Sequence, residues 1–191
     1  MCVNYKPLSH DDIIKYFNVD ISEEAEWPKE AYQNYLAPII RNDQYGEREA
    51  ITANYGMIPK QHIPFGMKQF STMNARSETV GKLRSFKTAW DKHQLCLVPM
   101  YLFYEPNYEN GKHERWAIGM ADHSPFAVAG LWRDWKEVDG SFSYSFTQLT
   151  INADDHALMN RFHKPGDEKR SLVIIPENDY DSWLDCCEIA A

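Results

Sequence analysis

The sequence predicts one α+β domain spanning residues 1–191, with a mainly antiparallel sheet. The chain is long enough for one domain with a sizeable core, and 14% of its residues are aromatic, which favours β structure. Asn110-Gly111 and Asp139-Gly140 are typical of hairpin turns between neighbouring strands. The remaining expected strands are runs of β-forming residues at 49–57, 95–105, 116–120, 126–132, 142–151 and 172–175.

The expected helices are few and short. Ser9, followed by Asp11 and Asp12, marks a helix start, because acidic groups stabilise the positive end of the helix dipole. Helical spacing of apolar residues predicts a second helix over 80–90, and shorter ones follow near 152–159 and over 176–184. Pro38 should exclude residues 32–40 from a central strand, Pro99 should interrupt the strand over 95–105, and 58–70 is expected to be an irregular loop.

Composition narrows the class of protein. There is no apolar run long enough to span a membrane and no signal peptide, so we expect a cytoplasmic protein, nucleoid-associated if bacterial. Its 4 cysteines should be reduced thiols, and without a CxxC spacing we expect no metal site and no cofactor. The formal net charge of −8 argues against a general nucleic-acid-binding surface. Residues 60–92 nevertheless carry net +5, which fits either a local basic face or a solvated helix surface.

Cys2 follows the initiator methionine, and it is small enough for that methionine to be removed. The product would carry an α-amine and a thiol on adjacent carbons. Such a residue can attack an acyl carbon with its own amine as base, or capture an aldehyde as an imine and then as a thiazolidine ring. Taken alone, Cys2 fits better with a small residue at a tolerant terminus, and the rest of the chain must supply the case for a functional role.

Three polar residues, Asn74, Arg76 and Glu78, precede the helix expected over 80–90. In an extended segment this spacing places all three side chains on one side, which suits an anion or a polar substrate. The alternative is a structural salt-bridge cluster.

Two further residues are candidates for acid–base chemistry. Glu105 ends the most apolar run of the chain, and a carboxyl group buried there would serve as a general acid or base. An exposed glutamate at a strand end is the alternative. His163 lies in an irregular segment with Pro165 and Gly166, a less ordinary setting than those of the other histidines. The chain has no Walker loop, GxSxG, HExxH or GxGxxG motif.

Taken in order, these residues resemble the SRAP family (SOS response-associated peptidases, the HMCES- and YedK-like proteins). The resemblance covers nearly the whole chain, and its most specific motif is NAR-x-E-T at 74–79. The matching residues are Met1-Cys2, Leu36-Ala37-Pro38, Asn74 to Thr79, Val98-Pro99 through Glu105, His163, Arg170 to Pro176 and Trp183-Leu184. Two departures are that Cys2-Val3-Asn4 stands where the family usually has Cys-Gly-Arg, and that the segment from His163 to Arg170 is longer.

The resemblance implies a pseudo-barrel fold and a covalent thiazolidine crosslink between Cys2 and abasic sites in single-stranded DNA. It also implies a shielding role in the DNA damage (SOS) response, with AP-lyase and self-processing cysteine peptidase (hydrolase) activity. The partners would be abasic single-stranded DNA and the replication machinery, with the protein acting as a monomer away from membranes. By position, Asn74 would place the Cys2 terminus or a bound sugar, Glu105 would be the acid/base, and His163 would aid proton transfer. Arg76, Tyr55 and Lys60 would contact DNA.

Two other classes of protein remain open at this point. An N-terminal nucleophile amidohydrolase of the glutamine amidotransferase type also begins with cysteine, and would release ammonia from glutamine. A non-catalytic binding module would be unaffected by blocking Cys2.

Overall fold

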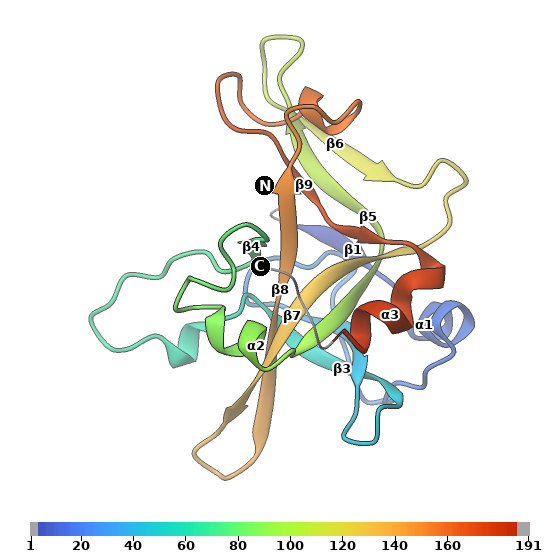
Figure 1. The fold of residues 1–191 in the computed structure, drawn as a ribbon, viewed down its shortest axis with the longest axis vertical. Helices are drawn as coiled ribbons and strands as arrows, with labels where there is room; N and C mark the ends of the chain where they lie inside the picture. The colour runs from blue at the N-terminus through green and yellow to red at the C-terminus, as the bar shows by residue number, and fades with distance from the viewer. Residues whose placement is uncertain (1–3, 187–191) are drawn as a thin grey trace.

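The structure, a computed structural model, describes residues 4–186, and five strands form its centre (Figure 1). These are β2 (Leu36–Asn42), β3 (Arg48–Tyr55), β5 (Leu95–Asn107), β7 (Phe126–Lys136) and β8 (Phe142–Asn152). They close into a barrel in the order β5-β2-β3-β8-β7, because β7 pairs again with β5. All pairings in this ring are antiparallel except β3 with β8. The predicted pseudo-barrel with mainly antiparallel pairing is confirmed.

Shorter elements surround the barrel. The strands are β1 (Tyr5–Pro7), β4 (Asn74–Arg76), β6 (Glu114–Gly119), β9 (Arg170–Leu172) and β10 (Ile174–Ile175). The helices are α1 (His10–Phe17), α2 (Lys87–Asp91) and α3 (Tyr180–Leu184), and the 3-10 turns are η1 (Lys60–His62), η2 (Met159–Arg161) and η3 (Glu177–Asp179). None of the helices in the described part of the chain is long and apolar enough to cross a membrane.

The two prolines do not break the barrel, contrary to expectation. Pro38 lies inside β2 and pairs with Thr52 of β3, while on its other edge β2 meets β5 only at Ile40. Pro99 lies inside β5, at the point where the outer partner of that strand changes from β2 to β1. Proline lacks the N–H that a second neighbour would need, and each proline lies where no second neighbour is paired.

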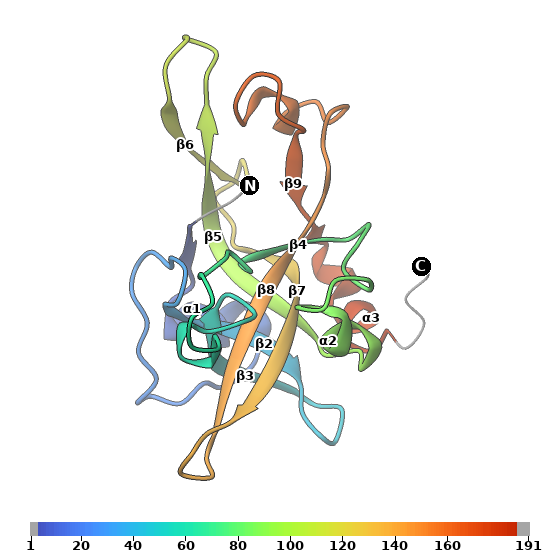
Figure 2. The same ribbon diagram turned by 90° about the vertical axis from the view of Figure 1, so that its left-hand side faces the viewer.

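Two arms extend beyond the same end of the barrel. One is the hairpin of β5 and β6, turned at Asn110-Gly111 with Gly111 at φ 73°; the other is formed by the ends of β8 and β9 with the chain between them (Figure 2). An isolated bridge between Asn107 and Phe162 joins the arms. The second predicted hairpin, β7 to β8, also forms, with Gly140 at φ 88°.

The helices are shorter than predicted, apart from α1. Ser9 caps α1 by accepting the Asp12 N–H, as its sequence indicates. Residues 77–86 form successive turns instead of a helix, and α2 begins only at Lys87. Val80 and Phe86 are buried all the same, so the apolar spacing reflects their packing and not a regular helix. Near 152–159 there is likewise no α-helix, only the turn η2 at its end.

The barrel interior is filled by aromatic and aliphatic side chains. Tyr55 stacks on Phe146 with ring centroids 5.2 Å apart and meets Tyr5 edge to face. Outside the barrel, α1 and α3 share a second cluster, in which Phe17 stacks on Tyr180 at 5.3 Å. Burial of such rings supplies much of the driving force for folding. The packed core thereby fixes the positions of the barrel strands from which the two arms extend.

Candidate functional site

Glu105 and His163 meet at the base of the two arms. Nε2 of His163 lies 3.0 Å from Oε2 of Glu105, and the side chains are 7% and 3% exposed, respectively. The contact has the distance of an ion pair but not the angles of a well-aligned hydrogen bond. Glu105 is a buried residue within β5 and not the exposed strand-end group that was the alternative. Residues proposed separately from the sequence thus form one pair.

Backbone contacts fix the position of His163. Its N–H donates to the carbonyl of Pro106 (2.8 Å), and its φ of 65° turns the chain sharply after η2. Nδ1 of the ring faces the N–H of Arg170 at 3.4 Å, which assigns Nδ1 the acceptor role. Nε2 then carries the ring proton toward Glu105. A buried carboxylate facing a ring N–H can exchange a proton with a substrate when water is excluded.

A hollow of about 590 Å3 opens beside this pair. His163 lines it together with residues of both arms, namely Tyr108, Glu109, Asp154, Asn160, Arg161, Pro165, Gly166 and Lys169. Arg161 is held there by Glu109 through two contacts of 2.8 Å. The hollow can admit a polar substrate to the edge of His163 without opening the barrel core.

A cluster around Glu30 was not predicted from the sequence. We call it the Glu30 cluster; Glu30 accepts hydrogen bonds from Asn4, Tyr32, Tyr104 and Arg115, at 2.6–3.2 Å. Burial alone would raise the pKa of Glu30, but hydrogen bonds from Arg115 and Tyr32 outweigh it and hold the pKa below its usual range. The cluster fixes Asn4, whose carbonyl also accepts the N–H of Tyr104, the neighbour of Glu105. Glu30 lies in a stretch that reads only as a polar loop, so no sequence signal identifies it.

The NAR segment forms β4, which pairs in parallel with β8, so that Asn74 lies opposite Gln148 and Arg76 opposite Thr150. Asn74 is half-buried, and Arg76 and Glu78 are exposed. The helix N-terminus expected beside them is absent, because α2 starts eleven residues after Arg76. Anion binding by a helix dipole is therefore not available here.

Arg76 and Glu78 belong to an ion-pair cluster, which we call the Arg170 cluster: Arg76, Glu78, Glu168 and Arg170. Arg76 lies 2.5 Å from Glu168, while Arg170 contacts Glu78 at 2.8 Å and Glu168 at 2.9 Å. The hydrogen bond from Arg170 lowers the pKa of Glu78 to about 2. This is the salt-bridge arrangement that the sequence left open, and it includes Glu168 from the long segment after His163.

The other two residues expected to face DNA lie in different environments. Lys60 is exposed, in η1. Tyr55 is fully buried in the barrel, and its hydroxyl donates to Gln148 at 3.0 Å. Tyr55 therefore offers no surface to DNA, because its ring is needed to fill the core.

Cys2 lies outside the described residues. Among the cysteines that the structure describes, Cys96 is fully buried, and burial raises the pKa of its thiol, which disfavours the nucleophilic thiolate. Within residues 4–186, no group of three or more His, Cys, Asp or Glu side chains could hold a metal ion.

Comparisons with known proteins find the same fold in solved structures. A crystal structure of a protein from Bordetella bronchiseptica is 38% identical, with a TM-score of 0.83, over 96% of this chain and 88% of that one. A structure from Bacteroides thetaiotaomicron shares the fold, with 17% identity and a TM-score of 0.74 over 96% of this chain and 81% of that one. The abasic site processing protein HMCES is 26% identical over 164 residues in Xenopus tropicalis and 24% over 177 residues in Pongo abelii.

These HMCES matches cover 75% and 76% of this chain but 47% and 48% of the relatives, so the chain spans about half the length of the curated relatives it matches. The profile of the family named SOS response associated peptidase (SRAP) matches residues 1–190. A match over nearly the whole chain, on a fold with the same barrel, shows that this protein belongs to the SRAP family.

Proposed function

We propose that this protein processes abasic sites in single-stranded DNA by covalent capture through Cys2 after removal of Met1. The observation that carries the proposal is the buried Glu105–His163 pair at the place where the N-terminal segment enters the fold. The carbonyl of Asn4 accepts a hydrogen bond from the N–H of Tyr104, the residue before Glu105. Cys2 precedes Asn4 by two residues, which span at most about 7 Å, and the proposal requires that its amine and thiol reach the pair. The relatives named for abasic-site processing support the choice of substrate.

The chemistry follows from the aminothiol. The open form of an abasic deoxyribose carries an aldehyde. The α-amine of Cys2 adds to the aldehyde carbon, the resulting hydroxyl leaves as water after it receives a proton, and an imine remains. The thiol then adds to the imine carbon, its proton passes to the nitrogen, and a thiazolidine ring closes. Atoms balance with the loss of one water.

The Glu105–His163 pair can supply the proton transfers that these reaction steps need from the protein. Ring opening of the sugar requires a proton on the ring oxygen, and imine formation requires one on the departing hydroxyl. Glu105, facing the Nε2 proton of His163, can donate and recover these protons in turn. Asn74 would orient the sugar from β4. An unpaired sugar costs less to reach than one stacked in a duplex.

The crosslink can be tested on a denaturing gel. Protein whose intact mass shows loss of Met1 is incubated with fluorescent single-stranded DNA carrying one abasic site. We expect a retarded, heat-stable band with wild type and with Cys186→Ser, which removes a different thiol. Cys2→Ala should lose the stable band. Absence of an adduct with Met1-free wild type would exclude the proposal, and release of ammonia from glutamine in its place would favour an amidohydrolase.

A further inference from the structure

The Glu30 cluster joins the first residue that the structure describes to the arm formed by β5 and β6. Oε2 of Glu30 accepts hydrogen bonds from the side chains of Asn4, Tyr32 and Arg115 at 3.1, 3.0 and 2.6 Å, and Oε1 accepts one from the Tyr104 hydroxyl at 3.2 Å. Asn4 itself is buried, with 3% of its surface exposed. One carboxylate therefore connects the N-terminal segment to both strands of the hairpin.

Main-chain hydrogen bonds hold the same segment from both sides. On one side, the carbonyl of Asn4 accepts the N–H of Tyr104 at 3.2 Å, and Tyr5 pairs with β5. On the other side, Tyr5 exchanges two backbone hydrogen bonds with Ala31, the neighbour of Glu30, at 3.3 and 2.9 Å. The contact between Glu30 and the Asn4 side chain extends this clamp by one residue toward the N-terminus.

The clamp lies one residue along β5 from the Glu105–His163 pair. Successive side chains of a strand point to opposite faces of the sheet. The side chain of Tyr104 therefore reaches Glu30, while Glu105 faces His163 on the opposite side. Displacement of Asn4 from β5 would move the chain that precedes it relative to Glu105.

Stability alone gives little reason for this cluster. The side chains of Glu30 and Arg115 are 33% and 44% exposed, and exposed ion pairs contribute little to the free energy of unfolding. The guanidinium of Arg115 lies over the ring of Tyr104, 3.4 Å from the centroid. Such stacking fixes the plane of the guanidinium and leaves its N–H groups able to hold a carboxylate. The cluster thus provides a fixed acceptor for the side chain of Asn4.

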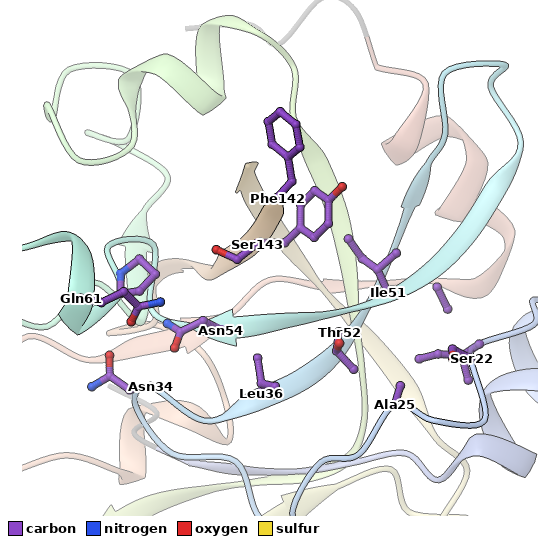
Figure 3. A pocket seen from close by; sticks show the side chains of 14 residues that line it. Ser22, Ala25, Asn34, Leu36, Ile51, Thr52, Asn54, Gln61, Phe142 and Ser143 are labelled. Carbon is purple, nitrogen blue, oxygen red and sulfur yellow. The ribbon is translucent and has the colours of Figure 1, made fainter. Parts of the chain in front are cut away.

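The hollow on the outer face of β2 and β3 shows no comparable arrangement. It measures about 610 Å3, and Asn34, Asn54 and Gln61 gather at one end of it (Figure 3). Among the described residues that line it, none is charged. Glu49, the neighbour of Ala50 in its wall, therefore offers a control position away from the N-terminal segment.

We propose that Glu30 is a positioning residue for abasic-site capture. It holds Asn4 against β5, so that the reacting N-terminus is presented to the Glu105–His163 pair. The inference rests on the proposed function, but Glu30 itself takes no part in the proton transfers.

Single-turnover crosslinking to an abasic oligonucleotide measures the effect on the reaction, with loss of Met1 verified by intact mass. We expect Glu30→Ala and Asn4→Ala each to lower the rate constant at saturating DNA about 10-fold, because small misplacements of reacting groups are costly. The double variant should be no slower than either single variant, since both remove one contact. The half-saturating DNA concentration and the final yield of adduct should stay as in wild type, whereas loss of the fold would lower the yield.

Two further variants separate positioning from a general loss of charge. Glu30→Gln can still turn an oxygen toward Asn4, so its rate constant should fall only about 2-fold. Glu49→Ala removes a carboxylate of similar exposure, 37%, which is also paired with an arginine, Arg41, at 2.8 Å. It should keep the wild-type rate constant.

Hydrogen exchange measured by NMR tests the anchor without any crosslink. The N–H of Tyr104 reports the contact with the Asn4 carbonyl directly. In Glu30→Ala this N–H should exchange about 5-fold faster, as loss of one hydrogen bond predicts, and in Glu49→Ala it should exchange as in wild type.

Two results would overturn the inference. One is that Glu30→Ala leaves the exchange of the Tyr104 N–H unchanged, which would show that Glu30 does not hold Asn4 on β5. The other is that exchange becomes faster while crosslinking proceeds as fast as in Glu49→Ala, which would reduce Glu30 to a structural contact. Wild-type protein that forms no adduct would overturn the proposed function instead, and the exchange measurement would still decide whether Glu30 anchors Asn4.

Discussion

The Glu105–His163 pair and the Arg170 cluster both depend on the segment 163–170, yet they hold their charges differently. In the pair, two nearly inaccessible groups face each other across 3.0 Å. In the cluster, the buried Arg170 donates to Glu78, to Glu168 and to two oxygens of Thr150. A group with this many donated bonds has little capacity left for a substrate. The pair is therefore suited to chemistry, and the cluster to supporting the structure around it.

The two are also physically connected. The backbone N–H of Arg170 faces Nδ1 of His163, and Lys169 donates to the His163 carbonyl at 3.3 Å. The cluster therefore helps to set the ring orientation on which the pair depends. Arg76, which the family resemblance makes a DNA contact, already lies 2.5 Å from Glu168. A DNA phosphate would have to displace that carboxylate first.

The largest expected effect is a loss of crosslinking rate when the Glu105–His163 pair is changed. Glu105→Gln keeps the shape of the side chain but cannot carry the proton, so we expect the rate of abasic-site crosslinking to fall about 100-fold. The measurement is a single-turnover time course on denaturing gels. Glu114→Gln on β6 removes a half-buried carboxylate from the same hairpin and should keep the wild-type rate. An unchanged rate in Glu105→Gln would remove Glu105 from the mechanism.

The barrel could be predicted from the sequence because its signals are local. The turns at Asn110-Gly111 and Asp139-Gly140 and the strand after each of them follow from turn chemistry and alternation. The prediction of a helix over 80–90 was wrong because the spacing of apolar residues indicates which side chains are buried. Tightly packed turns can bury residues at the same spacing as a helix does. A Cβ added to Gly81 would lie 2.9 Å from Trp90 Cδ1, which shows how closely these turns pack.

The site was predictable only residue by residue. Glu105 and His163 could each be proposed from their settings, but their contact depends on a bridge between residues 107 and 162 that no local pattern encodes. No sequence signal identifies Glu30 for the same reason, since three of its four hydrogen-bond donors come from distant parts of the sequence. The family resemblance implied that Tyr55 contacts DNA, but its ring is fully buried in the barrel core.

The second-largest expected effect is a loss of stability when the Arg170 cluster is broken. Arg170→Met removes the buried cation and leaves Glu78 and Glu168 without it. Breaking a buried ion pair costs about 3–5 kcal/mol, but these carboxylates are 47% and 36% exposed and can regain water. We therefore expect a loss of about 2 kcal/mol in the free energy of unfolding, measured with urea. The equivalent change at the exposed end, Arg76→Met, should cost less than about 0.5 kcal/mol. Equal losses in the two variants would show that Arg170 does not organise the cluster.

The smallest effect is a pH dependence that originates in Glu78. Its pKa is about 2 in the folded protein against an ordinary value of 4.5, because Arg170 stabilises the carboxylate. A lowered pKa contributes stability above pH 4.5, and this contribution is lost as the pH falls toward 2. Since Glu78 is 47% exposed, solvent screening limits this contribution to about 1 kcal/mol.

Urea unfolding should show wild type more stable than Glu78→Gln by that amount at pH 6, with more than half of the difference gone at pH 3. In an Arg170→Met background the same substitution should produce no such pH dependence, because the cation that lowers the pKa is missing. A difference that stays constant from pH 6 to pH 3 would place the Arg170–Glu78 contact with ordinary surface ion pairs. His163 would then be held by the Lys169 side chain, the Arg170 N–H and the Pro106 carbonyl, without help from that ion pair.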